Sequence, residues 1–239
     1  MKTQILQTLA ALALITTSAT AQDKPMENHT ASFIPMQAAE GKTEAFAEFL
    51  AGAAPIVKQT EPGTVLWFAL QAGDTLAIFD IFADEEARNA HFSGAVAAAL
   101  NQNADALVAG GWDAGVVANI NNSDVLSVKE AVDLYTATTA TYITLEAAPG
   151  KGPELAGLLT AAGPIVTETE PATLFWAALQ IDETNFAIFD IFASNAGREA
   201  HFAGQVAGLL KDKAADLVAG GWDDGVVAHV NNFDILAIK

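Results

Sequence analysis

Two aspartates and two histidines recur at matching positions in this chain of 239 residues. The segment Ala77 to Val96 (AIFDIFADEEARNAHFSGAV) returns as Ala187 to Val206 (AIFDIFASNAGREAHFAGQV), with 13 of 20 positions identical. Each copy predicts a strand with an aspartate at its centre, then a helix that carries one histidine. The chain thus offers two equivalent acid and imidazole pairs, which are Asp80 with His91 and Asp190 with His201.

Both aspartates need partners, because an unpaired carboxylate in an apolar strand costs several kcal/mol. His91 and Arg88 are available to Asp80 from the following helix, as His201 and Arg198 are to Asp190. If the carboxylate orients the imidazole, the histidine can act as a general base or hydrogen-bond a ligand. We therefore predict Asp80, Asp190, His91 and His201 as catalytic residues. In the alternative, these contacts only fix the helix against the sheet, as buried polar networks often do.

Tryptophans occupy matching strand positions in the two copies. Trp67 lies in the predicted strand 64–71 and Trp176 in the predicted strand 173–180. Period two places Trp67 on one face of its strand and Phe68 on the other. Such aromatics belong to a core or stack on an aromatic substrate. Trp112 and Trp222 follow paired glycines and are expected to cover the end of the sheet.

Composition excludes several classes of partner and cofactor. Lys and Arg total 11 against 29 Asp and Glu, for a formal charge of −18, so nucleic acid and anionic membranes would be repelled. Cysteine is absent, which excludes disulfides and thiolate-bound metals. His29 and His229 have no metal-ligand spacing, and no phosphate-binding glycine motif is present. We predict neither a cofactor nor a metal.

The first residues differ from all that follow. Residues 1–21 combine Lys2, a short apolar run and the small residues Ala19-Thr20-Ala21, which is typical of a secretory signal cleaved after Ala21. Residues 22–28 are then a flexible leader. We expect a periplasmic or secreted protein with no membrane segment after cleavage.

The remaining chain reads as two units, 29–130 and 138–239, joined by the linker 131–137. Each unit predicts strand, helix, strand, strand, helix, strand. Pro55 and Pro164 should kink or end the first helix. Pro35 should place its strand at a sheet edge or break the strand locally. The second helix is expected over about Glu85 to Leu107, ending at paired glycines.

Four motifs occur in both units. They are a turn (Glu61-Pro62-Gly63, Glu170-Pro171-Ala172), the strand Phe-Asp-Ile-Phe, the arginine and histidine helix, and the closing Asp-x-Leu-x-x-Lys that ends at Lys129 and Lys239. With these motifs each unit resembles the antibiotic biosynthesis monooxygenase (ABM) domain of the ferredoxin-like dimeric α/β-barrel superfamily. The resemblance implies an α+β fold in which two ferredoxin-like βαββαβ repeats form an intramolecular dimeric α/β barrel. The two halves would cover each other's bare sheet faces.

The resemblance implies an exported, cofactor-independent monooxygenase acting on a small aromatic or quinol-like compound. The implied substrate-binding residues are Trp67, Trp176, Phe82, Phe192, Arg88 and Arg198. The sequence departs from characterised branches, because Phe82 and Phe192 stand where aromatic oxygenases of the family place tryptophan. Asn101 and Lys211 stand where haem-degrading members place an axial histidine, which disfavours haem.

Two alternatives to an enzyme are a noncatalytic periplasmic protein that binds a small ligand or responds to stress, and a barrel whose pockets are filled by its own side chains. A cavity beside each histidine that is large enough for a ligand would exclude the barrel with filled pockets.

Overall fold

The computed structural model describes residues 29–239, so the predicted signal sequence and leader lie outside the described residues. The first repeat comprises β1 (Thr30–Gln37), α1 (Thr43–Ala51), α2 (Ala54–Thr60), β2 (Thr64–Ala72), β3 (Thr75–Phe82), α3 (Glu85–Phe92), α4 (Ala95–Leu107), α5 (Gly111–Gly115), η3 (Val117–Asn119) and β4 (Asn121–Lys129). After η4 (Leu134–Thr136), the second comprises β5 (Thr139–Glu146), α6 (Gly152–Thr169), β6 (Thr173–Gln180), β7 (Asn185–Phe192), α7 (Asn195–Phe202), α8 (Gln205–Leu217), η5 (Val227–His229) and β8 (Val230–Ile238). Within this part of the chain no helix is long and apolar enough to cross a bilayer.

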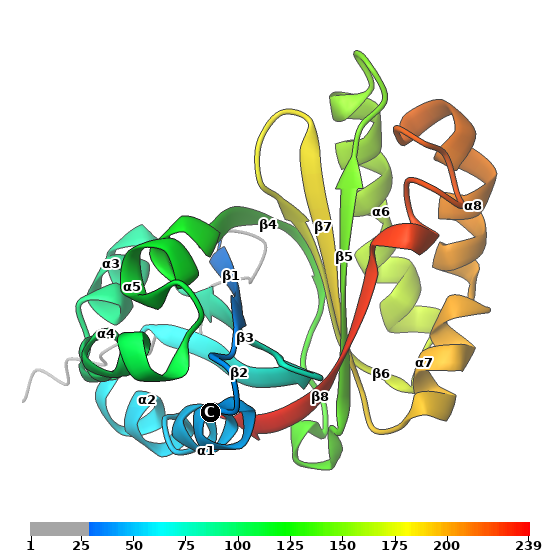
Figure 1. The fold of residues 1–239 in the computed structure, drawn as a ribbon. Helices are drawn as coiled ribbons and strands as arrows, with labels where there is room; N and C mark the ends of the chain where they lie inside the picture. Colours follow the sequence, from blue (N-terminus) through cyan, green and yellow to red (C-terminus); the bar gives the residue numbers. More distant parts are fainter. Residues whose placement is uncertain (1–28) are drawn as a thin grey trace, which may run out of the picture.

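All eight strands join into one closed barrel in the order β1-β3-β2-β8-β5-β7-β6-β4. The last strand of each repeat lies between the two repeats: β4 pairs with β1 and with β6, while β8 pairs with β5 and with β2. Figure 1 shows β8, in red, running from the second repeat to end beside α1. The predicted fold class, two ferredoxin-like repeats closing one barrel within a single chain, is confirmed.

The barrel interior is filled by side chains from both repeats. The Phe79 and Phe189 rings stack with their centroids 3.7 Å apart, and the Phe33 and Tyr142 rings stack at 3.8 Å. Phe79 and Phe189 are matching positions of the two repeats, as are Phe33 and Tyr142. A stack of matching residues indicates that a pseudo-twofold axis passes through the barrel, as in a symmetric dimer.

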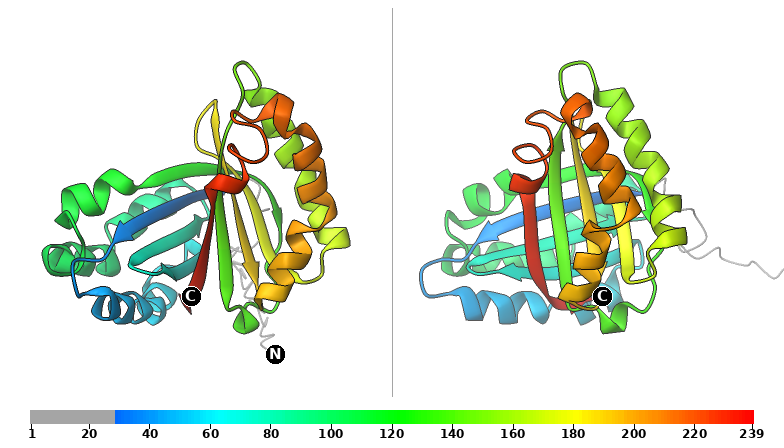
Figure 2. Two further views of the ribbon diagram at one scale, coloured as in Figure 1. Left: turned by 45° about the vertical axis from the view of Figure 1, so that its right-hand side comes forward. Right: turned by 90° about the vertical axis from the view of Figure 1, so that its right-hand side faces the viewer.

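Helices cover the outer face of each half. Figure 2 shows the helices of the two repeats on opposite sides of the barrel. The predicted alternation along the second strand is confirmed, because Phe68 belongs to the barrel core while Trp67 packs among α1, α2 and α4 residues on the outer face. Between each sheet and its helices lies a second apolar layer, centred on Trp67 in one half and Trp176 in the other.

The expected helix over Glu85 to Leu107 is wrong, because α3 ends at Phe92 and α4 begins at Ala95. Gly94 caps α4 in an extended conformation, and Gly204 does the same for α8 in the second repeat. The sequence pattern did not reveal this break, because alanines on both sides of it favour a continuous helix. The predicted stop at paired glycines is confirmed in part: Gly110 and Gly111 both have positive φ, but the helix has ended three residues earlier, at Leu107.

The prolines act differently in the two repeats. Pro55 lies in the first turn of α2, after a break that follows α1, whereas Pro164 lies inside the continuous helix α6. The matching residues before these prolines are Ala54 and Gly163. A Cβ at Gly163 would lie 2.2 Å from the Ser127 Oγ of β4, so glycine allows α6 to lie directly on the strand that the first repeat contributes. The expectation for Pro35 is wrong, because β1 continues through Pro35 and lies between β3 and β4 in the closed barrel. Pro35 is tolerated because it pairs with β3 beyond the last β1–β4 pair, where β4 needs no N–H from it.

Candidate functional site

Asp80 and Asp190 point out of the barrel toward the helices and are completely buried. Asp80 follows Ile78 by two residues on β3, and Ile78 belongs to the layer between sheet and helices. Among the described residues neither oxygen of either carboxylate has a hydrogen-bond partner. Each carboxyl group therefore depends on the charged groups around it, and on the proton it carries.

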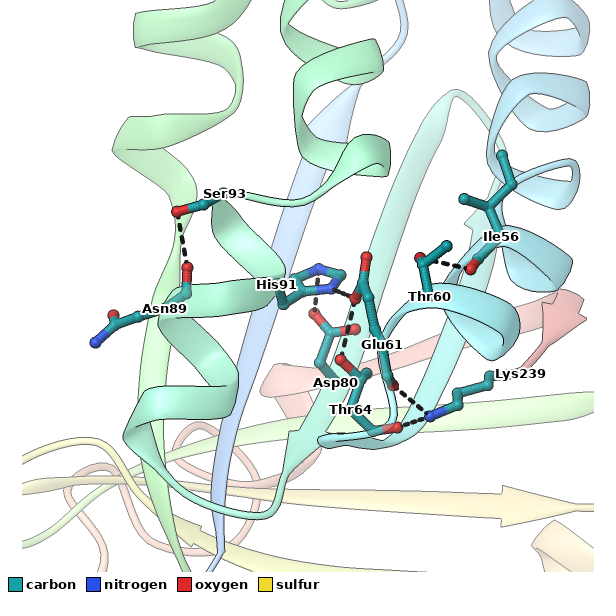
Figure 3. Close-up of polar contacts among 9 residues, drawn as sticks. All are labelled: Ile56, Thr60, Glu61, Thr64, Asp80, Asn89, His91, Ser93 and Lys239. Carbon is teal, nitrogen blue, oxygen red and sulfur yellow. Dashed lines mark hydrogen bonds and ion pairs between the residues drawn. The ribbon is translucent and has the colours of Figure 1, made fainter. Parts of the chain in front are cut away.

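His91 lies opposite Asp80, with its Nε2 atom 3.8 Å from Asp80 Oδ2. The other ring nitrogen, Nδ1, lies 2.5 Å from Glu61 Oε2 (Figure 3). Glu61 also accepts a hydrogen bond from the Thr64 hydroxyl at 3.1 Å. The imidazole is thus held between two carboxyl groups, one of which the sequence had not assigned to the site.

The second repeat repeats this arrangement. His201 Nε2 lies 3.7 Å from Asp190 Oδ2, and His201 Nδ1 forms a short contact with Glu170 Oε2. Glu170 also accepts a hydrogen bond from the Thr173 hydroxyl at 3.3 Å. We call each set of Asp, His and Glu the acid–histidine cluster: Asp80, His91 and Glu61 in the first repeat, and Asp190, His201 and Glu170 in the second.

The turn that carries each glutamate is placed by close approach to the neighbouring helices. A Cβ at Gly94 would lie 2.8 Å from Glu61 Oε1, and one at Gly204 would lie 2.6 Å from Glu170 Oε1. The helix break at these glycines therefore makes room for the glutamate carboxylates.

A second approach of turn and helix differs between the repeats. A Cβ at Gly63 would lie 2.6 Å from Ala87 Cβ, whereas the second repeat has Ala172 in the turn and Gly197 in the helix. In the first repeat the space therefore holds one methyl group, that of Ala87. The second repeat is looser, because a Cβ at Gly197 would lie 3.8 Å from Ala172 Cβ, an ordinary contact distance.

Burial and charge shift the titration of the clusters strongly. The pKa of Asp80 and that of Asp190 are raised to about 7, mainly by burial. The nearby histidine lowers each value, and the nearby glutamate raises it. For His91 and His201, burial by itself lowers the pKa, but the aspartate charge and the glutamate hydrogen bond outweigh it and leave the pKa above its ordinary value. The pKa of each aspartate and that of its histidine are thus both raised, so the two groups of a cluster titrate as a coupled pair.

A lysine approaches each cluster from the other repeat. Lys239, the residue after β8, donates from Nζ to Glu61 O at 2.9 Å and also to Thr64 O (Figure 3). Lys129, the last residue of β4, donates from Nζ to Glu170 O at 2.5 Å. Burial lowers the pKa of both lysines, opposed in each case by the nearby glutamate.

A cavity of about 440 Å³ lies beside the second cluster. His201 forms part of its wall, and apolar residues form most of the rest, including Trp176, Ile188, Leu210 and Trp222. Exposed residues at its wall, Phe202 and Val227, place it within reach of solvent. Its volume suits a small aromatic molecule.

The sequence encodes the same wall in the first repeat. Every residue lining the second-repeat cavity has an identical residue at the matching position, except that Ile120 replaces Val230. The two tryptophans at the matching strand positions, Trp67 and Trp176, each keep an indole N–H without an acceptor within residues 29–239. Trp67 is the cross-strand partner of Asp80, and Trp176 is that of Asp190. Each cluster therefore has an unsatisfied donor and unsatisfied acceptors on adjacent strands.

Of the other predicted site residues, the phenylalanines contact the histidine rings and Arg88 pairs elsewhere. Phe82 packs against the His91 ring and Phe192 against the His201 ring, with centroids 5.3 and 5.6 Å apart. Arg88 forms an ion pair with Glu85 on its own helix at 3.3 Å. The predicted partner of Asp80 is therefore His91 and not Arg88. Arg198 occupies the matching position on α7. Within residues 29–239 no group of three His, Asp or Glu side chains is arranged to hold a metal ion.

Sequence reasoning missed Glu61, Glu170, Lys129 and Lys239 as parts of the site. All four stood in motifs shared by both repeats, the Glu-Pro turn and the closing lysine. The sequence could have identified them, because an acid or a base occurs at matching positions of two copies that differ elsewhere.

No family model matches the sequence, and no curated protein matches it. Among solved structures, a candidate monooxygenase from Fusobacterium nucleatum is 15% identical, with 88% of this chain and 94% of that chain covered and a TM-score of 0.72. A candidate monooxygenase from Lactobacillus acidophilus is 10% identical, with 89% and 96% covered and a TM-score of 0.69. A Nitrosomonas europaea protein of unknown function is 34% identical over 44% of this chain and 94% of its own, with a TM-score of 0.39.

The closed barrel and the two candidate monooxygenases establish the fold of this chain. The chain has a barrel built from two ferredoxin-like βαββαβ halves in one polypeptide, and it shares this fold with the two candidate monooxygenases. The resemblance read from the sequence is confirmed at the level of the fold.

Proposed function

We propose that this protein is a cofactor-independent monooxygenase that acts on a small aromatic or quinol-like compound. The observation that carries the proposal is the apolar cavity of about 440 Å³ whose wall includes the histidine of a buried acid–histidine cluster. Oxidation of a quinol by O₂ needs no external reductant, because the ring itself supplies two electrons. One oxygen atom enters the ring, the other leaves as water, and the product is a hydroxylated quinone.

The protein's part in such a reaction is to remove a proton from the substrate and to exclude water from the anion. The sequence suggested histidine as the base and aspartate as the group that orients it. A shared role is favoured, because Asp190 Oδ2 faces His201 Nε2 across 3.7 Å and burial raises the pKa of Asp190 to about 7. We propose that the His201–Asp190 pair accepts the proton of a bound hydroxyl, while Glu170 fixes the ring through Nδ1.

The walls of the cavity suit the same class of substrate. Trp176 and Trp222 contribute flat apolar surfaces to the wall, which suit stacking on an aromatic ring. The identical residues of the first repeat lead us to propose two sites per chain, with Asp80, His91 and Glu61 in the same roles.

Oxygen uptake with a panel of quinols tests the proposal. We expect uptake by the wild type that requires O₂, and a loss of at least about 100-fold when His91→Ala is combined with His201→Ala, the size typical of a lost acid–base group. Replacement of the exposed His229 by Ala is the matched control and should change nothing. Uptake that persists at the wild-type rate in the double variant would exclude the assigned base.

A noncatalytic ligand-binding protein is the alternative, and it is favoured by one observation. Both ring nitrogens of each histidine already face a carboxyl group. Quinol binding without oxygen uptake, measured by calorimetry on the same panel, would support this alternative.

Export is a further proposal, resting on the sequence of residues 1–21 alone. The mass of the protein recovered from its native host tests it, since cleavage after Ala21 would leave Gln22 as the first residue.

A further inference from the structure

Each repeat receives one lysine from the other at the backbone of its glutamate turn. The ammonium group of Lys239 comes from β8 of the second repeat and binds the carbonyl oxygens of Glu61 and Thr64 in the first. The ammonium group of Lys129 comes from β4 of the first repeat and binds the Glu170 carbonyl in the second. The two lysines are matching residues, so the exchange is reciprocal.

These contacts depend on the strand pairing that closes the barrel. Lys129 is the cross-strand partner of Trp176 in the β4–β6 ladder, and the Lys239 backbone N–H donates to Trp67 O at 3.0 Å. Each lysine therefore touches the backbone at two walls of a site in the opposite repeat: the tryptophan strand and the glutamate turn. Lys129 is only 5% exposed, an unusual position for lysine unless the ammonium group is bound.

The lysine contacts act on the backbone that sets the glutamate carboxylate. Thr64 N donates to Glu61 O at 3.2 Å across the turn, and Lys239 binds the carbonyls at both ends of the same turn. With the backbone fixed at Glu61, its side chain has fewer ways to leave His91. A charged donor strengthens such contacts relative to neutral ones.

We infer that Lys129 and Lys239 are positioning residues, each holding the glutamate turn of the opposite repeat so that the Glu–His hydrogen bond forms there. The acid–histidine cluster of either repeat is then complete only in the closed barrel. This inference does not require the proposed reaction, because it concerns the geometry of the clusters.

The direction in which the pKa of His91 changes on loss of Lys239 distinguishes a lost charge from a lost Glu61 hydrogen bond. His91 faces Asp80 from β3, Glu61 from the turn and Lys239 from β8, while Lys58 of α2 acts on Lys239. As a charge, Lys239 lowers the pKa of His91, so removing the charge alone would raise it. Loss of the Glu61 hydrogen bond has the opposite sign, because that bond raises the pKa of His91.

Proton NMR of the full chain tests the inference through the imidazole Nδ1–H signals, which a short bond to a carboxylate shifts far downfield. Glu61→Gln and Glu170→Gln assign the two signals to His91 and His201. In Lys239→Met we expect the His91 signal to be lost or shifted upfield and the pKa of His91 to fall, while the His201 signal stays. Lys129→Met should give the reverse pattern.

Lys58→Met is the control, since Lys58 is exposed, and it should leave both signals in place. Lys239→Arg, which keeps a charged donor, should retain the His91 signal. If Lys129→Met does not fold because Lys129 is buried, Lys239→Met decides alone. The inference is overturned if the His91 signal survives in Lys239→Met, if both signals are lost together, or if the pKa of His91 rises.

Discussion

Replacing Asp190 by asparagine should stabilise this protein, and more so as the pH rises. Burial raises the pKa of Asp190 from 3.8 to about 7 in the folded chain. In the unfolded chain the group ionises near its ordinary pKa, so between these two values the folded state binds more protons. Stability contributed by Asp190 is therefore greatest below pH 3.8 and is lost as the pH rises to about 7.

The size of the effect follows from the pKa shift. A shift of about three units corresponds to roughly 4 kcal/mol of stability lost from acid to alkaline pH. Asparagine has the shape of aspartate without the charge, so it avoids this loss. It also gives up the attraction between Asp190 and the His201 ring at 3.7 Å. We therefore expect a net gain in unfolding free energy of about 2 kcal/mol above pH ~7.5, and almost none near pH ~4.

Urea unfolding of the wild type and Asp190→Asn across this pH range measures the difference directly. Asp212→Asn, on the exposed face of α8, is the matched control and should stay within about 0.5 kcal/mol at every pH. A variant that is less stable than the wild type at alkaline pH would refute the reasoning. It would mean that Asp190 is an ionised partner of His201 whose pairing outweighs its burial.

Three further predictions concern packing and pH. Gly163→Ala should cost about 1–3 kcal/mol of unfolding free energy in urea titrations, because its Cβ would meet the other repeat's β4, whereas Gly157→Ala on the open face of the same helix should gain about 0.5–1 kcal/mol. Equal effects of the two changes would contradict the close α6–β4 contact. Gly63→Ala should destabilise by about 1–3 kcal/mol, and adding Ala87→Gly should restore most of it; a double-mutant cycle without coupling would argue against a shared space for one methyl group. Oxygen uptake, if it depends on ionised Asp190, should rise as the pH passes about 7 and should be absent in Asp190→Asn, so an uptake that falls over this range would oppose the proposed base.

Local pattern was sufficient for most of the fold. The repeat of 20-residue segments predicted two like halves, and alternation along β2 placed Trp67 and Phe68 on opposite faces of the strand. The structure then showed Phe68 inside the barrel and Trp67 outside it. These features could be read because strand faces follow from a period of two, and because a sheet with helices on one side needs cover on the other. The helix break at Gly94 could not be predicted from local pattern, because the contact that requires glycine there comes from Glu61, more than 30 residues earlier.

The sequence by itself determined which residue types each site contains, because the acids, histidines, tryptophans and lysines recur at matching positions. Only the tertiary structure decided their partners. Asp80 could have paired with Arg88, and nothing local to Lys239 connects it with Glu61, 178 residues away. That contact exists because β8 leaves its own repeat to pair with β2, and strand register across a closed barrel is set by the packing of both halves together.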